Sequence, residues 1–431
     1  MLNIKNAYMG NTTSLPKSTT IVIIGGGIVG MTAALTLAER NIPVVVLEKG
    51  RVGMEQSSRN LGWVRKTNRL PDDIPLATES DKLWAKMSER VGEDVGYRQN
   101  GCMFIAKTKA QMAIYEKWLE SVAHLDLGST LLSENEIKAK IPGNIGHWAG
   151  GLYTPTDGYA EEEIAPFAIA RAAAKKGVVI VENCAARKLS LSSGKIAGVH
   201  TEQGEIKCEQ VLLASGLWSR RFLGNEGIKF PTLPLICSVM RTTPMQGPTD
   251  IAMAAPNFSF RKHQDGGFVM MQRGAIEAPL SLDHLLLGLK YLKILKEQHS
   301  MTRITLNKYL WEDLLRGRHW GKNDMSPFEM MRTMNPQPNE KIIDEAIKNT
   351  SAAWPVFAQL EIEKTWGGMI DVTPDSNPVI DHIDKIPGLT IATGFSGHGF
   401  GTAPAAGQLA ADLISGHSPI VDPKIYRFNR F

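Results

Sequence analysis

Short runs of β-branched apolar residues alternate with helix-forming stretches near the start of the chain. Residues 21–24 (Ile-Val-Ile-Ile) and 44–47 (Val-Val-Val-Leu) contain no polar position, which is typical of strands that a sheet buries on both faces. Between them, residues 31–40 contain no glycine or proline and consist largely of good helix formers. This order predicts a β-α-β unit with two parallel strands.

The same patterns predict further elements along the rest of the chain. Helical periodicity covers residues 81–91, 111–123, 161–176 and 282–296, and a last helix is expected over 403–415. Residues 189–208 alternate apolar and polar positions around Ser193-Gly194 and Gln203-Gly204, a pattern that predicts a β-meander with two tight turns. Strands are also expected near 177–181, 210–216, 233–240, 268–273 and 389–392. The fold class is therefore α/β, with a Rossmann-like sheet and a second, mixed α+β part.

A glycine-rich turn joins the first predicted strand to the first predicted helix. Gly25, Gly27 and Gly30 form a GxGxxG pattern, and the second strand ends on an acid, Glu48. Gly25 suits a tight turn, Gly27 lets the backbone approach a pyrophosphate, and Gly30 lets the helix pack close to the sheet. An acid at the end of the second strand accepts hydrogen bonds from ribose hydroxyls. With both strands and the acid in place, the pattern predicts an adenine-dinucleotide site.

The segment after Glu48 favours FAD over NAD. Lys49 is followed at residues 56–59 by Gln-Ser-Ser-Arg, which can donate hydrogen bonds to a phosphate and to the edge of a flavin ring. A nicotinamide dehydrogenase would continue with regular βαβ units. Here the predicted helices 81–91 and 111–123 instead leave the nucleotide-binding fold.

Composition and charge exclude several classes of function. The 431 residues are 43% hydrophobic, and 48 Lys and Arg residues face 44 Asp and Glu residues, so no general attraction to nucleic acid is expected. The four cysteines lie far apart, and the ten histidines do not cluster in metal-ligand spacings, so neither a disulfide framework nor a metal site is expected. HExxH, GxSxG and P-loop patterns are absent from the sequence.

Targeting signals do not stand out in the sequence. The first 20 residues lack the apolar core of a signal peptide, and the apolar stretch 21–37 is shorter than the roughly 20 residues that span a bilayer. We therefore expect a cytoplasmic protein, with peripheral contact at the inner face of the membrane as a further expectation.

Five segments together resemble the D-amino-acid oxidase superfamily of FAD-dependent oxidoreductases, which includes glycine and sarcosine oxidases. They are residues 21–48, 56–59, 211–216, 366–375 and 394–401, the last reading Gly-Phe-Ser-Gly-His-Gly-Phe-Gly. Within this superfamily the chain looks most like the bacterial membrane-associated L-amino acid deaminases. Residues 55–59, 183–187, 231–234 and 326–329, with Arg273, carry that closer resemblance.

Two features depart from the deaminases. From the sequence we expect no counterpart of their N-terminal membrane anchor, and Gly397-His398-Gly399 is the general superfamily form of the C-terminal loop. Substrate identity and membrane residence are therefore not carried over directly.

The resemblance also implies residues for the substrate side. Arg273 aligns with the arginine that binds the substrate carboxylate, a task that a bidentate guanidinium performs well. Arg241 and Arg261 are rival candidates that spacing does not separate. Trp366 could line the substrate side or be an ordinary core residue.

The loop around His398 is expected to run along the flavin, before a helix that starts near Thr402 and favours negative charge on the reduced ring. His398 is assigned to flavin contact rather than to proton transfer. The last cysteine is Cys237, so covalent attachment through a C-terminal cysteine is excluded and FAD is expected to be held non-covalently. The expected FAD-binding residues are Gly25, Gly27, Gly30, Glu48, Lys49, Gln56, Ser57, Ser58, Arg59, Ala186, Gly216, Gly397, His398, Gly399, Phe400, Gly401 and Thr402.

We expect a discontinuous FAD-binding domain built from residues 20–62, 155–225 and 360–431. Residues 63–154 and 226–359 form the expected substrate domain, with a membrane-facing helical insertion at about 278–325. In its predicted helix, Lys290, Lys293 and Lys296 recur between leucines, which suits a helix lying on an anionic bilayer or one packed on its own domain.

The expected reaction is the oxidative deamination of a small amino acid, with a primary L-amino acid as the leading substrate class. The Cα hydride passes to the flavin, and water converts the imino acid to an oxo acid. Oxygen or a membrane quinone is the expected electron acceptor. Alternatives are a D-amino acid or a secondary amine such as sarcosine or a proline derivative, a flavin subunit of a multi-component dehydrogenase, and an enzyme acting on a tRNA-borne amine.

Overall fold

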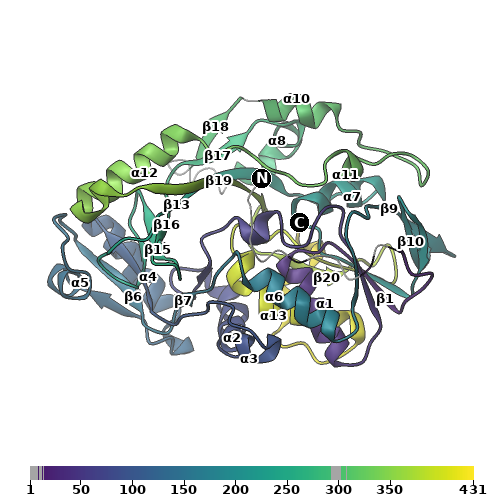
Figure 1. Ribbon diagram of the computed structural model, residues 1–431, viewed down its shortest axis with the longest axis horizontal. Helices are drawn as coiled ribbons and strands as arrows, with labels where there is room; N and C mark the ends of the chain where they lie inside the picture. Colours follow the sequence, from purple (N-terminus) through teal and green to yellow (C-terminus); the bar gives the residue numbers. More distant parts are fainter. Residues whose placement is uncertain (1–7, 9–11, 13, 293–301, 307) are drawn as a thin grey trace.

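The first of two large sheets is the Rossmann-like one. The structure is a computed structural model that describes residues 8, 12, 14–292, 302–306 and 308–431 (Figure 1). Strands β1, β2, β8, β12 and β21 run parallel, and β20 pairs antiparallel to β21 at one edge. The order is β20-β21-β12-β1-β2-β8. Its strands are β1 Ile21–Ile24, β2 Val44–Leu47, β8 Val179–Val181, β12 Gln210–Leu213, β20 Val379–His382 and β21 Leu389–Thr393.

Helices cover one face of this sheet and a meander covers the other. Helices α1 (Ile28–Glu39), α6 (Ala165–Lys175) and α13 (Gly399–Ser415) share one apolar core with Ile21 and Ile23 (Figure 1). Because side chains alternate along a strand, Val22 and Ile24 point the opposite way, into a second core with residues of the meander. The meander strands are β9 Ala186–Ser192, β10 Lys195–Thr201 and β11 Gly204–Lys207.

The second sheet has ten strands and is mostly antiparallel. Its order is β18-β17-β13-β16-β15-β14-β4-β6-β5, and β19 pairs with β13 off this path. Helix α12 (Glu340–Ala353) packs on one face, and α4 (Lys109–Ser121) packs on the other. The strands are β4 Cys102–Ala106, β5 Thr130–Leu132, β6 Gly150–Thr154, β13 Leu233–Thr242, β14 Ala252–Ala254, β15 Ser259–Lys262, β16 Phe268–Met271, β17 Ile276–Pro279, β18 Thr302–Thr305 and β19 Ile362–Val372.

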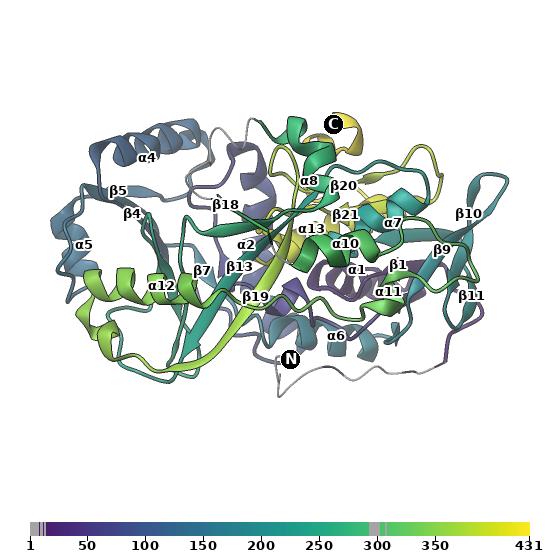
Figure 2. The same ribbon diagram turned by 90° about the horizontal axis from the view of Figure 1, so that it is seen from above.

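The two sheets lie side by side along the long axis. In Figures 1 and 2, α4 and α5 lie toward one end of that axis and the β9–β11 meander lies toward the other. A two-stranded ribbon of β3 (Trp63–Val64) and β7 (Gly158–Tyr159) lies against the start of α13. The remaining helices are α2 Ile74–Ala85, α3 Met87–Val91, α5 Glu134–Lys140, α7 Ser219–Asn225, α8 Leu282–Leu287, α10 Lys308–Leu315 and α11 Pro327–Met330, with 3-10 turns η1 Gln56–Ser58, η2 Pro71–Asp73, η3 Ala123–Leu125, η4 Gly216–Trp218, η5 Gly288–Tyr291, η6 Pro355–Gln359, η7 Pro423–Tyr426 and η8 Phe428–Arg430.

The expected α/β class, the β-α-β unit and the meander are confirmed. Two helix starts were wrong. α13 begins at Gly399 rather than near 403, so Gly399 and Gly401, which were expected in a loop, lie in its first turn. α6 begins at Ala165 rather than 161, because the acids at 161–163 are used in ion pairs instead.

The helix expected over 282–296 is interrupted. Helix α8 ends at Leu287 and a 3-10 turn follows at Gly288–Tyr291, while Lys293 and Lys296 fall outside the described residues. Within the described part of the chain, none of the helices combines the length and the apolar character that a membrane-spanning segment requires.

The division into two domains stays a prediction. All six strands of the first sheet fall inside the three segments expected for the FAD domain. Strand β19 also falls inside them, yet it pairs with β13 of the second sheet along most of its length.

Candidate functional site

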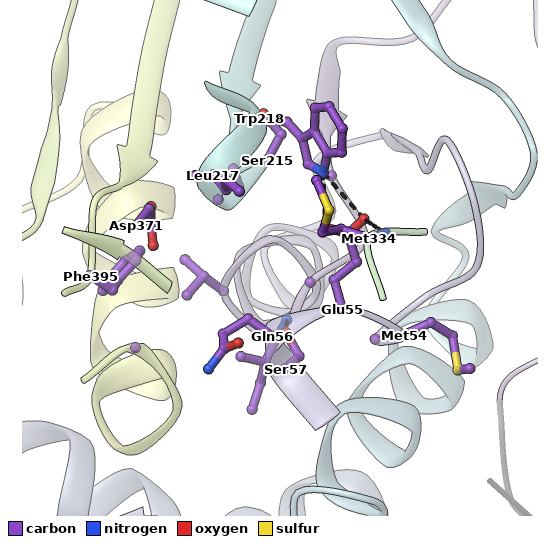
Figure 3. A pocket seen from close by; sticks show the side chains of 18 of the residues that line it. Met54, Glu55, Gln56, Ser57, Ser215, Leu217, Trp218, Met334, Asp371 and Phe395 are labelled. Atoms are coloured by element: carbon purple, nitrogen blue, oxygen red, sulfur yellow. Dashed lines mark hydrogen bonds between the residues drawn. The ribbon is translucent and has the colours of Figure 1, made fainter. Parts of the chain in front are cut away.

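A cavity opens at the carboxyl ends of the parallel strands (Figure 3). Its lining includes Gly25 after β1, Glu48 after β2, Ala214 after β12 and Phe395 after β21. Residues 369–371 of β19 line it as well, so both sheets contribute. The crevice beyond the carboxyl ends of parallel strands is the position at which α/β sheets bind ligands.

The glycine turn forms a backbone cradle beside this cavity. Gly25 has φ of +114°, and a Cβ there would lie 2.5 Å from the Ala214 carbonyl oxygen. A Cβ on Gly30 would lie 2.3 Å from the carbonyl oxygen of Gly25, so only glycine lets α1 start this close to the turn. The Ile28 backbone N–H donates to Ser57 Oγ at 2.9 Å, which places that hydroxyl at the positive end of α1.

Glu48 is held by backbone donors on both sides. Its two carboxylate oxygens accept from the Gly26 N–H at 2.8 Å and from the Gly50 N–H at 2.7 Å. Burial raises the pKa of the Glu48 carboxyl, while the charge of Lys49 and these two hydrogen bonds act in the opposite direction. A carboxylate with further acceptor positions therefore stands at the end of β2, where a ribose is expected.

Lys49 is occupied by protein groups rather than free to bind a ligand. Its ammonium donates to Glu55 at 2.6 Å and to the carbonyl oxygens of Met331 and Arg332 at 3.0 and 2.9 Å. Trp218 Nε1 donates to both Glu55 oxygens at 2.9 and 3.2 Å (Figure 3). Glu55 thus links Lys49 and Trp218, which both line the cavity.

Some buried polar atoms of the cavity lining lack partners. Gln56 Oε1 and Arg59 Nη2 are buried without a hydrogen bond in the described structure. Arg59 is 1% exposed and makes no ion pair with any described carboxylate, and burial lowers its pKa. Unpaired polar atoms of this kind indicate a ligand that would satisfy them.

The start of α13 forms another part of the cavity wall. Gly397, Gly399 and Phe400 line the cavity, and His398 is the residue immediately before the helix. Burial lowers the pKa of His398 well below its ordinary value, and the charges of Arg69 and Arg65 lower it further, so the ring is neutral at pH 7. The assignment of His398 to flavin contact stays a prediction.

Asp371 lies beside Phe395 in the cavity wall (Figure 3). It accepts the Gly394 N–H at 2.7 Å and the Thr393 hydroxyl at 3.2 Å. Burial raises the pKa of its carboxyl to about 6.

Most of the expected FAD-binding residues line this cavity. Those outside the lining are Gly30, Ser58, His398, Gly401 and Thr402. Gly30 packs α1 on the turn, Gly401 packs α13 on Trp63 of β3, and His398 is the residue before α13. Ser58 is buried, and the Thr402 hydroxyl donates to the His398 carbonyl at 3.0 Å. The expected residues that do line it are Gly25, Gly27, Glu48, Lys49, Gln56, Ser57, Arg59, Ala186, Gly216, Gly397, Gly399 and Phe400.

The structure separates the three candidate arginines. Arg241 pairs with Glu363 at 2.7 Å and with Glu163 at 3.1 Å. Arg261 is fully buried and donates to both oxygens of Glu161 at 3.0 and 2.9 Å, and to Glu162. Arg273 has no described carboxylate as an ion-pair partner and donates only to the Ala255 carbonyl, at 3.0 Å. Of the three, Arg273 alone keeps its charge available for a ligand.

Trp366 lies in the core rather than in the cavity lining. It is 3% exposed and packs with Val239 and Val269 in a small cluster that Leu61 also contacts. Its indole N–H is buried without a partner in the described structure. Of the two interpretations of Trp366, the structure favours the core residue.

Sequence reasoning did not single out Glu55 as a carboxylate that organises the cavity, nor Trp218, Asp371 and Arg65. The Glu55 carboxylate also accepts the N–H of Met334, 279 positions later in the sequence, and no local pattern signals such a contact. Trp218 lies two residues after Gly216 and could have been noted as part of the turn after β12. Across the described ranges, no group of three His, Cys, Asp or Glu side chains could hold a metal ion.

The residues present fit FAD. The glycine cradle and the start of α1 suit a pyrophosphate, and Glu48 suits a ribose. The unpaired atoms of Gln56 and Arg59 and the close backbone of residues 397–400 suit a planar ring with polar edges.

Comparisons with known proteins show the family of this chain. The profile of the family described as FAD dependent oxidoreductase (DAO) matches residues 20–413. Among solved structures, the L-amino acid deaminase from Proteus vulgaris is similar at a TM-score of 0.94 with 30% identity, over 99% of this chain and 100% of that one. The L-amino acid deaminase from Proteus myxofaciens, in complex with anthranilate, is similar at a TM-score of 0.95 with 29% identity, over 99% of this chain and 96% of that one.

Curated relatives are more distant in sequence. Mitochondrial sarcosine dehydrogenase from Mus musculus is 23% identical over 98% of this chain. The chain spans about two fifths of that relative's length, 42% of it.

Proposed function

Because the chain belongs to the DAO family of FAD-dependent oxidoreductases, we propose that it oxidises the Cα–N bond of a small amino acid. A primary L-amino acid is the leading substrate class, since the L-amino acid deaminases are similar over nearly the full length of both chains. Bound FAD supplies the hydride acceptor in this chemistry and passes the electrons on to oxygen or to a membrane quinone.

The observation that carries the proposal is the unpaired guanidinium of Arg273. Burial lowers the pKa of Arg273, and its only described polar bond goes to a backbone carbonyl. A half-buried guanidinium without a carboxylate partner is well placed to bind an anion. A substrate carboxylate supplies that anion, and the fork of the guanidinium fixes the orientation of the substrate Cα.

Other residues of the chain favour the neutral form of the substrate amine. His398 is neutral, and Arg65 and Arg273 make the surroundings positive, so an ammonium group loses its proton more readily there. Loss of hydride from the neutral amine leaves an imino acid, and water hydrolyses it to an oxo acid and an amine or ammonia. Gln56, Arg59 and the backbone of residues 397–400 would hold the non-covalently bound FAD.

An anaerobic absorbance spectrum of the FAD-loaded protein tests this function. Each candidate amine is added in turn, and we expect the flavin band to bleach with an L-amino acid but not with its D-enantiomer. Bleaching by a D-amino acid or by sarcosine would replace the substrate class, and air readmission would separate an oxidase from a dehydrogenase. Failure of all these amines to bleach the flavin would contradict the function and favour a subunit that acts only with a partner.

We also propose that the protein contacts a lipid bilayer through an apolar surface of α8, η5, β18 and α10. Leu289 is 84% exposed, Leu315 81% and Leu306 76%. These segments lie together at one edge of the molecule (Figure 1), and Lys290 is exposed among them. Apolar side chains with a basic neighbour suit the interface of an anionic bilayer. The remaining members of this surface are Leu285, Leu286, Leu292, Ile304, Trp311 and Leu314.

A further inference from the structure

Two arginines lie over the same aromatic ring near the start of α13. The guanidinium carbon of Arg65 is 5.2 Å from the centre of the Phe104 ring, and that of Arg273 is 5.1 Å from it. Phe104 is buried in β4, while Arg65 follows β3 and Arg273 follows β16. Three separate strands therefore converge on one doubly cationic group, which we call the Phe104 arginine pair.

Neither member of the pair is neutralised. Arg65 donates to the Thr67 carbonyl and Arg273 to the Ala255 carbonyl, and neither forms an ion pair with a described carboxylate. Burial, with smaller contributions from the charges of Arg69 and Arg273, lowers the pKa of Arg65 to about 10. The two side chains are half-buried, and each positive charge makes the position of the other less favourable until an anion binds.

The acid whose charge acts on Arg65, Asp157, and the acid beside the neighbouring Arg69, Asp73, both have other partners. Asp157 accepts the backbone N–H groups of Lys66 and Thr67 at 2.9 Å and lies 3.1 Å from the Lys66 ammonium. Asp73 is the ion-pair partner of Arg69. The excess positive charge is therefore a property of this site.

The Phe104 arginine pair adjoins the part of the cavity that is lined by the start of α13. A Cβ on Gly401 would lie 2.5 Å from the Trp63 carbonyl oxygen, so the first turn of α13 presses on β3, which leads directly into Arg65. The positive charge of Arg65 contributes to lowering the pKa of His398, which lies at the start of that helix. A substrate held by the pair would lie beside the part of α13 that lines the cavity.

We propose that the substrate carries two carboxylates, with Arg273 binding the one next to the reacting carbon and Arg65 binding the second. This rests on the proposed function. One carboxylate fills one guanidinium fork and leaves the other cation unpaired, whereas a dicarboxylic amine neutralises both. Two kinds of amine have this chemistry: an acidic amino acid, and an amino acid whose nitrogen bears a carboxyalkyl group.

Carboxylates that cannot be oxidised give the first test. Glutarate and succinate are titrated into the FAD-loaded protein by calorimetry, beside valerate and butyrate, which match them in carbon number. We expect each dicarboxylate to bind at least ~10-fold more tightly than its monocarboxylate partner, because a charge-assisted pair is gained. Equal affinities would overturn the proposal.

Substitutions then assign the two arginines. Arg65→Met should weaken glutarate binding by ~10-fold or more and change valerate binding less than about threefold, whereas Arg273→Met should weaken both ligands. Arg98→Met, which alters a surface arginine paired with Asp94, is the matched control. If Arg65→Met and Arg273→Met weaken valerate equally, one carboxylate is clamped by both residues and the proposal is wrong. Arg65→Gln serves as a second variant should Arg65→Met fail to bind FAD.

Amines distinguish the two sources and separate this inference from the reaction. L-Aspartate and L-glutamate are compared with L-asparagine and L-glutamine for anaerobic flavin bleaching, and iminodiacetate is compared with sarcosine. Faster bleaching by the first two identifies an acidic amino acid, and faster bleaching by iminodiacetate identifies an N-carboxyalkyl amine. Tight glutarate binding without bleaching by any amine would refute the proposed oxidation and leave the two-carboxylate site supported.

Discussion

Single glycines decide whether the cofactor cradle can form. At Gly30 an added methyl group would lie 2.3 Å from a backbone oxygen, and no side chain can move aside to relieve this contact. At Gly224, in α7, an added Cβ meets nothing within 4 Å. The two positions therefore make a matched pair.

We expect Gly30→Ala to destabilise the protein by at least about 2 kcal/mol and to abolish FAD binding, because α1 must move away from the turn. Gly224→Ala should be neutral or stabilise by about 0.5–1 kcal/mol, since alanine favours a helix. Urea unfolding and the ratio of flavin to protein absorbance measure both effects. A Gly30→Ala protein with normal FAD content would show that the cradle tolerates a shift.

Elements are joined by charge where apolar contacts are few. Asp283 of α8 accepts from Arg220 of α7 at 2.8 Å and from Arg318 at 2.9 Å. Burial alone would raise the pKa of Asp283, but these two arginines outweigh it and bring the pKa down to about 2. The ionised carboxylate is thus stabilised by folding.

Since the folded pKa of Asp283 is lower than the unfolded one, its contribution is present above about pH 4 and is lost as the pH falls toward 2. We expect Asp283→Asn to lower the free energy of unfolding by about 1–2 kcal/mol at pH 7. The deficit should stay constant from pH 8 to 5 and shrink below pH 4, as urea titrations at each pH would measure. Asp250→Asn, at an exposed pair with Lys262, should cost less than about 0.5 kcal/mol. A deficit that grows on acidification would refute this account.

The apolar surface of α8, η5, β18 and α10 has its own test. Leu289→Glu combined with Leu315→Glu should reduce co-sedimentation with vesicles of mixed neutral and anionic lipid at least ~10-fold, because two charges replace inserted side chains. Ile114→Glu, at an apolar residue of α4 that is 62% exposed, is the control and should leave sedimentation unchanged. Equal loss in both proteins, or no binding by the native protein, would rule out this surface as the contact.

At the largest scale, the cavity connects the two sheets. Gly25, Glu48 and Ala214 come from the first sheet and residues 369–371 from the second, so FAD would bind groups from both. Ligand that binds only the folded protein stabilises it by mass action.

We therefore expect FAD at about 100 times its dissociation constant to raise the free energy of unfolding by about 2.7 kcal/mol. Far-ultraviolet circular dichroism during urea unfolding, with and without added FAD, measures this. ADP, which lacks the flavin end, should stabilise much less at the same concentration. If ADP stabilised as much as FAD, the part of the cavity expected to hold the flavin ring would contribute nothing to binding.

Local sequence patterns were enough to predict a dinucleotide site in this protein. A buried strand, glycines at fixed spacing and an acid ending the next strand specify a backbone shape within 28 residues, so the dinucleotide site and the α/β class could be predicted. Helix boundaries were predicted less accurately. The start of α13 depends on its packing against β3, and the start of α6 depends on ion pairs formed by residues 161–163.

Tertiary structure alone decided which charges are free. Arg241, Arg261 and Arg273 each lie on or directly after an apolar strand, and the sequence does not distinguish them. In the fold, Arg241 and Arg261 meet carboxylates from distant segments, and Arg273 instead meets Phe104 and Arg65. A backbone turn is fixed by the residues within it, whereas the neutralisation of a charge depends on whichever groups folding brings within a few ångströms of it.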